Sequence, residues 1–128
     1  MASTSRAATV LIADDEPAVR RLIVRLLDRC APGCLVAQAD DVPQAKDLLI
    51  SLRPDLAVLD LRMPTGNGLE LCRLIQSHPW LSKTRVLVLT GYPSSRVREK
   101  TFAEGACEFL PKPFENHELI ASLGRLLA

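Results

Sequence analysis

The stretch VLIADDEPA, residues 10 to 18, joins a run of four apolar residues directly to three acidic ones. An apolar run without polar alternation indicates a strand that is buried on both faces. Pro17 favours a helix immediately after the acids, because proline lacks only a backbone N–H that the first helical turn leaves unpaired. The adjacent carboxylates of Asp14 and Asp15 repel each other, so the residues that end this strand require a physical explanation.

The same alternation of apolar strand and amphipathic helix continues along the chain. Helical periodicity is clear in residues 19–27, 42–52 and 119–127, and it is weaker in 69–77 and 95–104. Short apolar runs predict strands at residues 9–13, 35–39, 56–59, 85–89 and 108–110. We therefore expect an α/β protein with a (βα)5 doubly wound parallel sheet, flavodoxin-like, with strand order 2-1-3-4-5. Ligands of such sheets bind beyond the carboxyl ends of the strands, near the first and third.

Length and composition narrow the classes of function. The 128 residues suit one domain, which we expect at residues 9–128 after a flexible tail at 1–8. A net charge of +1 argues against direct nucleic-acid binding, and the chain contains no apolar run long enough to predict a membrane span. The four cysteines lack paired zinc-ligand spacing, so we expect reduced thiols and a cytoplasmic location.

Polar residues follow the predicted strands at the same edge of the sheet. Asp14 and Asp15 follow the first strand, Asp60 the third, Thr90 the fourth and Lys112 the fifth. Because the carboxyl ends of adjacent parallel strands meet at one edge, we expect these five side chains to face one crevice.

Each of these residues also has a purely structural interpretation. The Asp pair could cap a helix, Asp60 could start a turn, Thr90 could be a capping hydroxyl, and Lys112 could be a solvated loop charge. Three clustered carboxylates, however, would raise at least one pKa unless a cation shared the site. Mg²⁺ takes oxygen ligands and commonly combines carboxylates with a phosphate, which indicates phosphoryl chemistry with Asp60 as the nucleophile.

Four segments together resemble the receiver domain of bacterial two-component response regulators. They are VLIADDEP with its acidic pair, VLDLRMPTGNG with its candidate phosphoacceptor, LTGY with its hydroxyl, and FLPKPF with its lysine. The segments occur in the family's order and at its spacing, and the resemblance covers residues 9 to 127. The resemblance implies a phosphoacceptor domain that switches on phosphorylation and is not an enzyme, apart from weak autophosphatase activity.

The resemblance also implies roles for the residues at the matched positions. Asp60 would accept a phosphoryl group from the phosphohistidine of a histidine kinase. Asp14, Asp15, Asp60 and the main-chain carbonyl of Arg62 would bind Mg²⁺ as the cofactor. The expected partner is therefore a sensor histidine kinase or a phosphotransfer protein.

Switching is implied for a second group of residues. Thr90 and Lys112 would contact the phosphoryl group, and Thr90 and Phe109 would move on phosphorylation. These movements would change the face formed by the fourth helix, the fifth strand and the fifth helix. An output domain or a second copy of the chain could bind this face.

Two functional alternatives are open at this point. A pseudo-receiver would bind partners without phosphate, although the set of acids, hydroxyl and lysine is intact. An aspartyl-phosphate phosphatase would usually carry a second Asp two residues after its nucleophile, where this chain has Arg62. Arg62 and Tyr92 lie two residues after Asp60 and Thr90, and we expect both side chains to slow hydrolysis of an acyl phosphate.

The first predicted helix carries four arginines, Arg20, Arg21, Arg25 and Arg29. Their spacing indicates a solvated helix face. The alternative is a docking surface for the kinase, because receiver domains meet the phosphohistidine helices near this helix.

Overall fold

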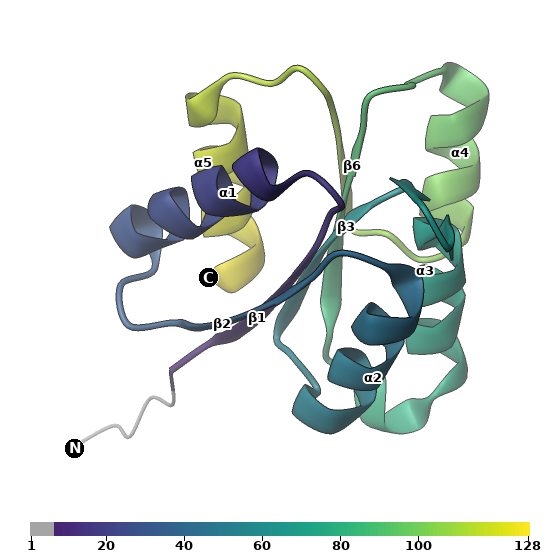
Figure 1. Cartoon of the computed structure of the whole chain (residues 1–128), viewed down its shortest axis with the longest axis horizontal. Coiled ribbons are helices and arrows are strands. Elements are labelled where there is room, and N and C mark those ends of the chain that lie inside the picture. The colour runs from purple at the N-terminus through teal and green to yellow at the C-terminus, as the bar shows by residue number, and fades with distance from the viewer. Residues whose placement is uncertain (1–6) are drawn as a thin grey trace.

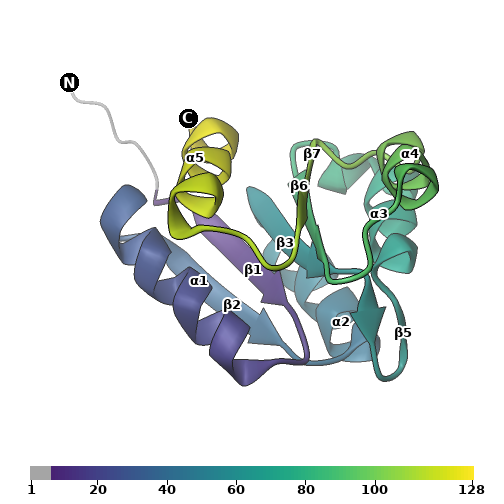
Figure 2. The ribbon, with the colours of Figure 1, turned by 90° about the horizontal axis from the view of Figure 1, so that it is seen from above.

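A computed structural model describes residues 7–128, so the predicted tail at 1–8 lies mostly outside the described residues. The described chain is a three-layer α/β structure with a central parallel sheet (Figure 1). Figure 2 shows from above that helices cover both faces of this sheet. One face of the sheet is covered by α1 (Pro17–Cys30) and α5 (Asn116–Leu127). The other face is covered by α2 (Val42–Leu52), α3 (Gly68–Ser77) and α4 (Ser95–Ala103).

The sheet has the spatial order β2-β1-β3-β6-β7, and all neighbouring strands are parallel. In chain order of its five strands this is 2-1-3-4-5, so the predicted topology is confirmed. The bounds are β1 (Thr9–Ala13), β2 (Leu35–Ala39), β3 (Leu56–Asp60), β6 (Arg85–Thr90) and β7 (Glu108–Pro111). The adjacent strands β1 and β3 are followed by α1 and α3, which lie on opposite faces of the sheet. The chain therefore leaves a crevice at the carboxyl ends of β1 and β3, and the carboxyl end of β6 lies beside it.

Three short elements were not anticipated. The loop after β3 contains an antiparallel pair, β4 (Arg62–Met63) and β5 (Gly66–Asn67), and a 3-10 turn, η1 (Pro79–Leu81), precedes β6. The Val42 N–H donates to Thr65 Oγ1 at 3.2 Å, which ties this loop to the start of α2. The loop that carries Asp60 into α3 is therefore ordered by its own pairing and by α2.

The expectation that every strand is buried on both faces is wrong for β2. This strand pairs only with β1, so it is an edge of the sheet, and the side chain of Leu35 at its start is 62% exposed. Each residue of β3 is buried, since β3 has a strand on either side and helices above and below it. Burial therefore follows a strand's place in the sheet, which an apolar run does not specify.

Apolar side chains form one cluster on each face of the sheet. The buried residues of α1 belong to the cluster on the face that α1 and α5 cover, as their periodic spacing predicts. They are Ile23, Leu26 and Leu27. Pro17 stands in the first turn of α1, and Asp41 caps α2 by accepting a hydrogen bond from the Gln44 N–H at 2.8 Å. Among residues 7–128, no helix combines the length and apolar character that crossing a bilayer requires.

Candidate functional site

Three polar residues at the strand ends form the same kind of local side-chain-to-backbone turn. Asp14, Asp60 and Thr90 each accept a hydrogen bond on a side-chain oxygen from the backbone N–H two residues further on, at 2.9, 3.2 and 3.1 Å. These turns are typical of Asp and Thr, whose short side chains reach their own backbone. In Asp14 and Asp60 the turn engages the Oδ1 oxygen and leaves the Oδ2 oxygen available to a partner in the crevice.

Lys112 joins these strand ends. Its Nζ donates to Asp14 Oδ2 at 2.9 Å and to Glu16 Oε1 at 3.1 Å, and it lies 3.5 Å from Asp60 Oδ2. The lysine side chain is 15% exposed. The interpretation of Lys112 as a solvated loop charge is therefore wrong, because Lys112 directly follows β7 and its side chain reaches the acids at the ends of β1 and β3.

The acidic residues form one cluster of oxygen atoms. Ligand oxygens of Asp14, Asp15, Glu16 and Asp60 all lie within 4.8 Å of one another. Asp14 and Asp60 are buried, whereas Asp15 and Glu16 are exposed. Four carboxylates without nitrogen or sulfur donors suit a hard, oxygen-seeking divalent cation such as Mg²⁺.

Glu16 belongs to this cluster, although the sequence analysis assigned it no role. Its place directly after the Asp pair was the available signal. The capping interpretation of the Asp pair is wrong, because Glu16 occupies the N-cap position of α1 and makes no side-chain capping bond there. Neither Asp14 nor Asp15 is therefore engaged as the cap of α1.

The close packing of these charged groups shifts the pKa values of Asp60 and Lys112. Burial, followed by repulsion from Asp14, raises the pKa of Asp60 to about 6, although Lys112 and the Arg62 N–H act in the opposite direction. Burial lowers the pKa of Lys112, but its hydrogen bond to Asp14 and the negative charges of Asp14 and Asp60 outweigh burial and raise that pKa. As expected, clustered carboxylates raise one carboxyl pKa, and burial contributes more than repulsion.

A hollow of about 280 Å³ opens over the acids and gives access to Asp60. Its lining includes Asp15, Gly91 and Lys112 together with Arg62 and Tyr92. The guanidinium carbon of Arg62 lies 3.9 Å from the centre of the Tyr92 ring, in cation–π geometry. A Cβ built on Gly91 would contact nothing, so the described structure does not require glycine at that position.

Gly68 is a second residue that the sequence analysis did not single out. A Cβ built there would overlap the backbone carbonyl of Asp60, and the Gly68 N–H donates to the Leu61 carbonyl at 2.9 Å. The absence of a side chain lets the start of α3 pack directly against the end of β3. A glycine at the first residue of a helix after a loop was the available signal.

The expected switch residues lie beside the site on the α4 side. Thr90 is buried, whereas Phe109 of β7 is half-buried against the cluster beneath α2 and α3. The ring of Phe109 lies 6.5 Å from that of Phe102 in α4. Lys112 and Pro113 are joined by a cis peptide bond.

The arginines of α1 divide into two kinds. Arg21, Arg25 and Arg29 are exposed, in agreement with a solvated face. Arg20 is half-buried, and its guanidinium donates to the Asp14 carbonyl, so the solvated interpretation is wrong for this residue. Helical spacing alone could not reveal that contact, because it depends on where the end of β1 lies.

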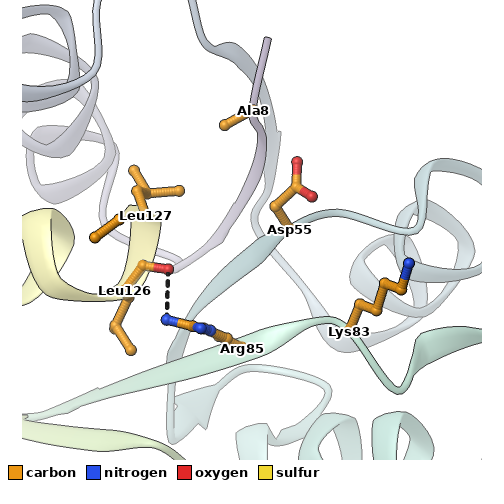
Figure 3. A pocket seen from close by; sticks show the side chains of 7 residues that line it. Ala8, Asp55, Lys83, Arg85, Leu126 and Leu127 are labelled. Carbon is orange, nitrogen blue, oxygen red and sulfur yellow. Dashed lines mark hydrogen bonds between the residues drawn. The ribbon is translucent and has the colours of Figure 1, made fainter. Parts of the chain in front are cut away.

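A different hollow, of about 270 Å³, lies at the opposite edge of the sheet, where the strands begin (Figure 3). Asp55 and Arg85 line it at the starts of β3 and β6, beside the end of α5. Arg85 Nη1 donates to the Leu126 carbonyl at 3.4 Å. This hollow contains none of the residues that the sequence analysis selected.

Fold and site together define a class: a doubly wound α/β protein with an acid cluster and a lysine at the carboxyl edge of its sheet. A sequence model of the response regulator receiver domain matches residues 10–124. The chain therefore belongs to the response regulator receiver domain family and is a receiver domain of a two-component system.

Individual relatives agree with this assignment. The response regulator MprA of Mycolicibacterium vanbaalenii is 41% identical over 118 residues, which cover 92% of this chain and 49% of the relative. The chain thus spans about half the length of the curated relatives it matches.

Solved structures show the same fold. The chemotaxis response regulator CheY4 of Vibrio cholerae superimposes with a TM-score of 0.84 at 27% identity, covering 94% of this chain and 99% of the other. A response regulator from Burkholderia pseudomallei, solved with a phosphorylated aspartic acid and a calcium ion, gives 0.79 at 28% identity, covering 91% and 66%.

Proposed function

We propose that this domain accepts a phosphoryl group on Asp60 from the phosphohistidine of a sensor histidine kinase or phosphotransfer protein. One observation carries the proposal: Asp60 is a buried carboxylate placed between the Arg62 N–H and Lys112, beside a second buried carboxylate. A similar Burkholderia protein, solved with a phosphorylated aspartic acid, supports this assignment.

The transfer follows from ordinary phosphoryl chemistry. A carboxylate oxygen of Asp60 attacks phosphorus, an O–P bond forms, and the P–N bond to the donor imidazole breaks. The electron pair of the P–N bond returns to the imidazole nitrogen, which then takes a proton from solvent. Lys112 stands 3.5 Å from Asp60 Oδ2, and its ammonium offsets negative charge that develops on the phosphoryl oxygens.

The donor set fits Mg²⁺, since it consists of carboxylate oxygens that converge within 4.8 Å. We propose that Asp14, Asp15, Asp60 and the main-chain carbonyl of Arg62 hold this ion. When bound, Mg²⁺ neutralises charge on the acids and on the phosphoryl oxygens. Lys112 already supplies one positive charge to Asp14 and Asp60, and it does so from the β7 side of the crevice.

We propose that the phosphoryl group redirects two side chains. The Thr90 hydroxyl, which now accepts from the Tyr92 N–H at 3.1 Å, would donate to a phosphoryl oxygen. Phe109, half-buried at present, would move inward beside it. The face made by α4, β7 and α5 would then change, and it is the proposed contact for an output domain or a second copy.

We propose that residues 9–128 form the receiver domain, and that it works in the cytoplasm, where its kinase partner would present phosphohistidine. Weak autophosphatase activity would follow from the access of water to Asp60 through the hollow.

Incubation with acetyl phosphate and Mg²⁺, followed by intact-mass measurement, tests the proposal. We expect a mass gain of one phosphoryl group, lost in Asp60→Asn and retained in Asp47→Asn, which changes an exposed carboxylate of α2. No gain at saturating donor would instead favour a phosphate-independent pseudo-receiver. Steady release of inorganic phosphate from many phosphomonoesters would favour a phosphatase.

A further inference from the structure

Arg20 connects the acidic turn to the edge strand of the sheet. Its Nη1 donates to the main-chain carbonyl of Asp14 at 2.6 Å, and its Nε donates to Gln38 Oε1 at 3.0 Å. Arg20 lies near the start of α1, whereas Gln38 belongs to β2. We propose that Arg20 is a positioning residue for the cation site, because it holds the peptide that directs the Asp15 carboxylate.

The bonds around Asp14 show what Arg20 adds. The Asp14 N–H donates to the Ala39 carbonyl at 3.0 Å, and its two carboxylate oxygens accept from the Glu16 N–H and Lys112. The Asp14 carbonyl is the remaining polar group of this residue, and Arg20 is its partner. That carbonyl belongs to the peptide leading into Asp15, so the guanidinium fixes the plane from which the exposed Asp15 projects.

Gln38 explains why an arginine suits this position. The planar guanidinium presents several N–H groups in a rigid fork, so one side chain can bind two acceptors at once. The Nε bond to Gln38 fixes the orientation of the fork, and the Nη1 bond then reaches Asp14. A lysine would keep the charge but could not bind both acceptors in this fixed geometry.

Charge and positioning predict opposite effects on Mg²⁺ binding. A guanidinium stays protonated, and a fixed positive charge near a cation site repels the cation. If Arg20 acted through its charge alone, removing it would tighten Mg²⁺ binding. If it orients ligands, removing it would weaken binding, because groups that orient metal ligands contribute strongly to affinity.

This inference rests on the proposed Mg²⁺ site, so calorimetric titration with Mg²⁺ is the test. Arg20→Ala should raise the Mg²⁺ dissociation constant by about tenfold, the lower end of the effect of losing a ligand-orienting partner. Arg20→Lys should lie between Arg20→Ala and the unaltered protein. Arg21→Ala is the matched control, since it removes the same charge from the neighbouring exposed position and should leave binding unchanged or slightly tighter.

Gln38→Ala gives a second, independent measurement. It removes one tether without changing charge, at an exposed position of an edge strand, and it should weaken Mg²⁺ binding by less than Arg20→Ala. Adding it to Arg20→Ala should have no further effect, because both act through one fork. Melting in chelator verifies that each variant folds, and Gln38→Ala decides the question if Arg20→Ala does not.

The outcomes separate this inference from the proposed function. Equal or tighter Mg²⁺ binding by Arg20→Ala, with unaltered binding by Gln38→Ala, would overturn the positioning role while leaving the metal site intact. No Mg²⁺ binding by the unaltered protein would overturn the metal site and this inference together. Faster amide hydrogen exchange at Asp15 and Glu16 in Arg20→Ala would support the role without any use of metal.

Discussion

Lys112 shows at the scale of a single residue how the site balances its charges. Its ammonium lies 2.9 Å from Asp14 and 3.5 Å from Asp60, so two buried carboxylates share one cation. Removal of Lys112 would leave both acids buried without that partner, which is far more costly than losing an exposed ion pair. The charge on Asp60 is nevertheless incompletely compensated, since its pKa remains raised to about 6.

This raised pKa predicts how stability depends on pH in the metal-free protein. The folded state binds the Asp60 proton more tightly than the unfolded state, whose pKa is near 3.8, so stability falls as pH rises through about 6. Asp60→Asn removes this loss. In chelator, Asp60→Asn should be more stable relative to the unaltered protein at pH 8 than at pH 4.5. The difference between the two relative stabilities should be on the order of 2 kcal/mol.

Urea unfolding at the two pH values measures both relative stabilities. Asp47→Asn changes an exposed carboxylate of α2 and serves as the control. Equal relative stabilities of Asp60→Asn at pH 4.5 and pH 8 would contradict the prediction.

The Arg62–Tyr92 pair leads to a prediction about the lifetime of the acyl phosphate. Both side chains line the hollow over Asp60, so we expect a water molecule that attacks the phosphoryl group to approach past them. Opening a cation–π pair costs about 0.5–1 kcal/mol, so Arg62→Ala with Tyr92→Ala should shorten the lifetime by about two- to fivefold. Intact mass followed over time after donor removal measures this lifetime.

Trp80 provides the control for this pair. It is a half-exposed aromatic residue of η1 that contacts His78 and does not line the hollow. Trp80→Ala should leave the lifetime unchanged, and an unchanged lifetime in the double variant would refute the gating role.

At the scale of elements, the site depends on how closely helices meet strand ends. The start of α3 lies against the end of β3, and Gly68 permits this approach because a Cβ would overlap the Asp60 carbonyl. Gly68→Ala should therefore destabilise the domain by about 1–3 kcal/mol, the usual cost of forcing an extra carbon into a packed position. It should also reduce the rate of phosphorylation, because the backbone of Asp60 must shift.

Gly124 is the matched control for Gly68. It lies exposed within α5, and a Cβ there would meet open space. Gly124→Ala should raise stability by about 0.5–1 kcal/mol, because alanine loses less backbone entropy in a helix. Chemical denaturation of both variants gives the two values, and a loss at Gly124 or no loss at Gly68 would contradict the argument.

At the scale of the whole molecule, metal binding should be visible as global stability. A ligand that binds only the folded state raises the melting temperature, and Mg²⁺ at a hundredfold its dissociation constant should add on the order of 5 °C or more. Asp15 is exposed and lies in the acid cluster, so Asp15→Asn should leave the metal-free melting temperature nearly unchanged. The same variant should lose most of the Mg²⁺-dependent gain.

Thermal melts with Mg²⁺ and with chelator check this prediction for both proteins. An equal gain in Asp15→Asn would exclude Asp15 as a ligand. A gain that also appears with a monovalent salt at matched ionic strength would indicate screening of charge in place of specific binding.

The sequence by itself determined the five helices, the five strands of the central sheet and their topology. Apolar runs and helical periodicity are local, so the five strands of the central sheet were predicted to within one residue of their observed bounds. The polar residues that follow those strands could also be predicted to face one crevice, because parallel strands bring their carboxyl ends to one edge. Side chains such as Asp14, Asp60 and Thr90 make their first hydrogen bonds only two residues away, which also lies within reach of local reasoning.

Only the tertiary structure decided how these groups meet. Lys112 reaches Asp14 across 98 residues and Asp60 across 52, and no local pattern specifies which of the surrounding acids it would bind. The exposure of β2, the approach of Gly68 to Asp60 and the reach of Arg20 to Asp14 likewise depend on neighbours that are set by packing. Local patterns specify which chemical groups reach the edge of the sheet, whereas their distances, burial and pKa values follow from how the packed layers bring distant segments together.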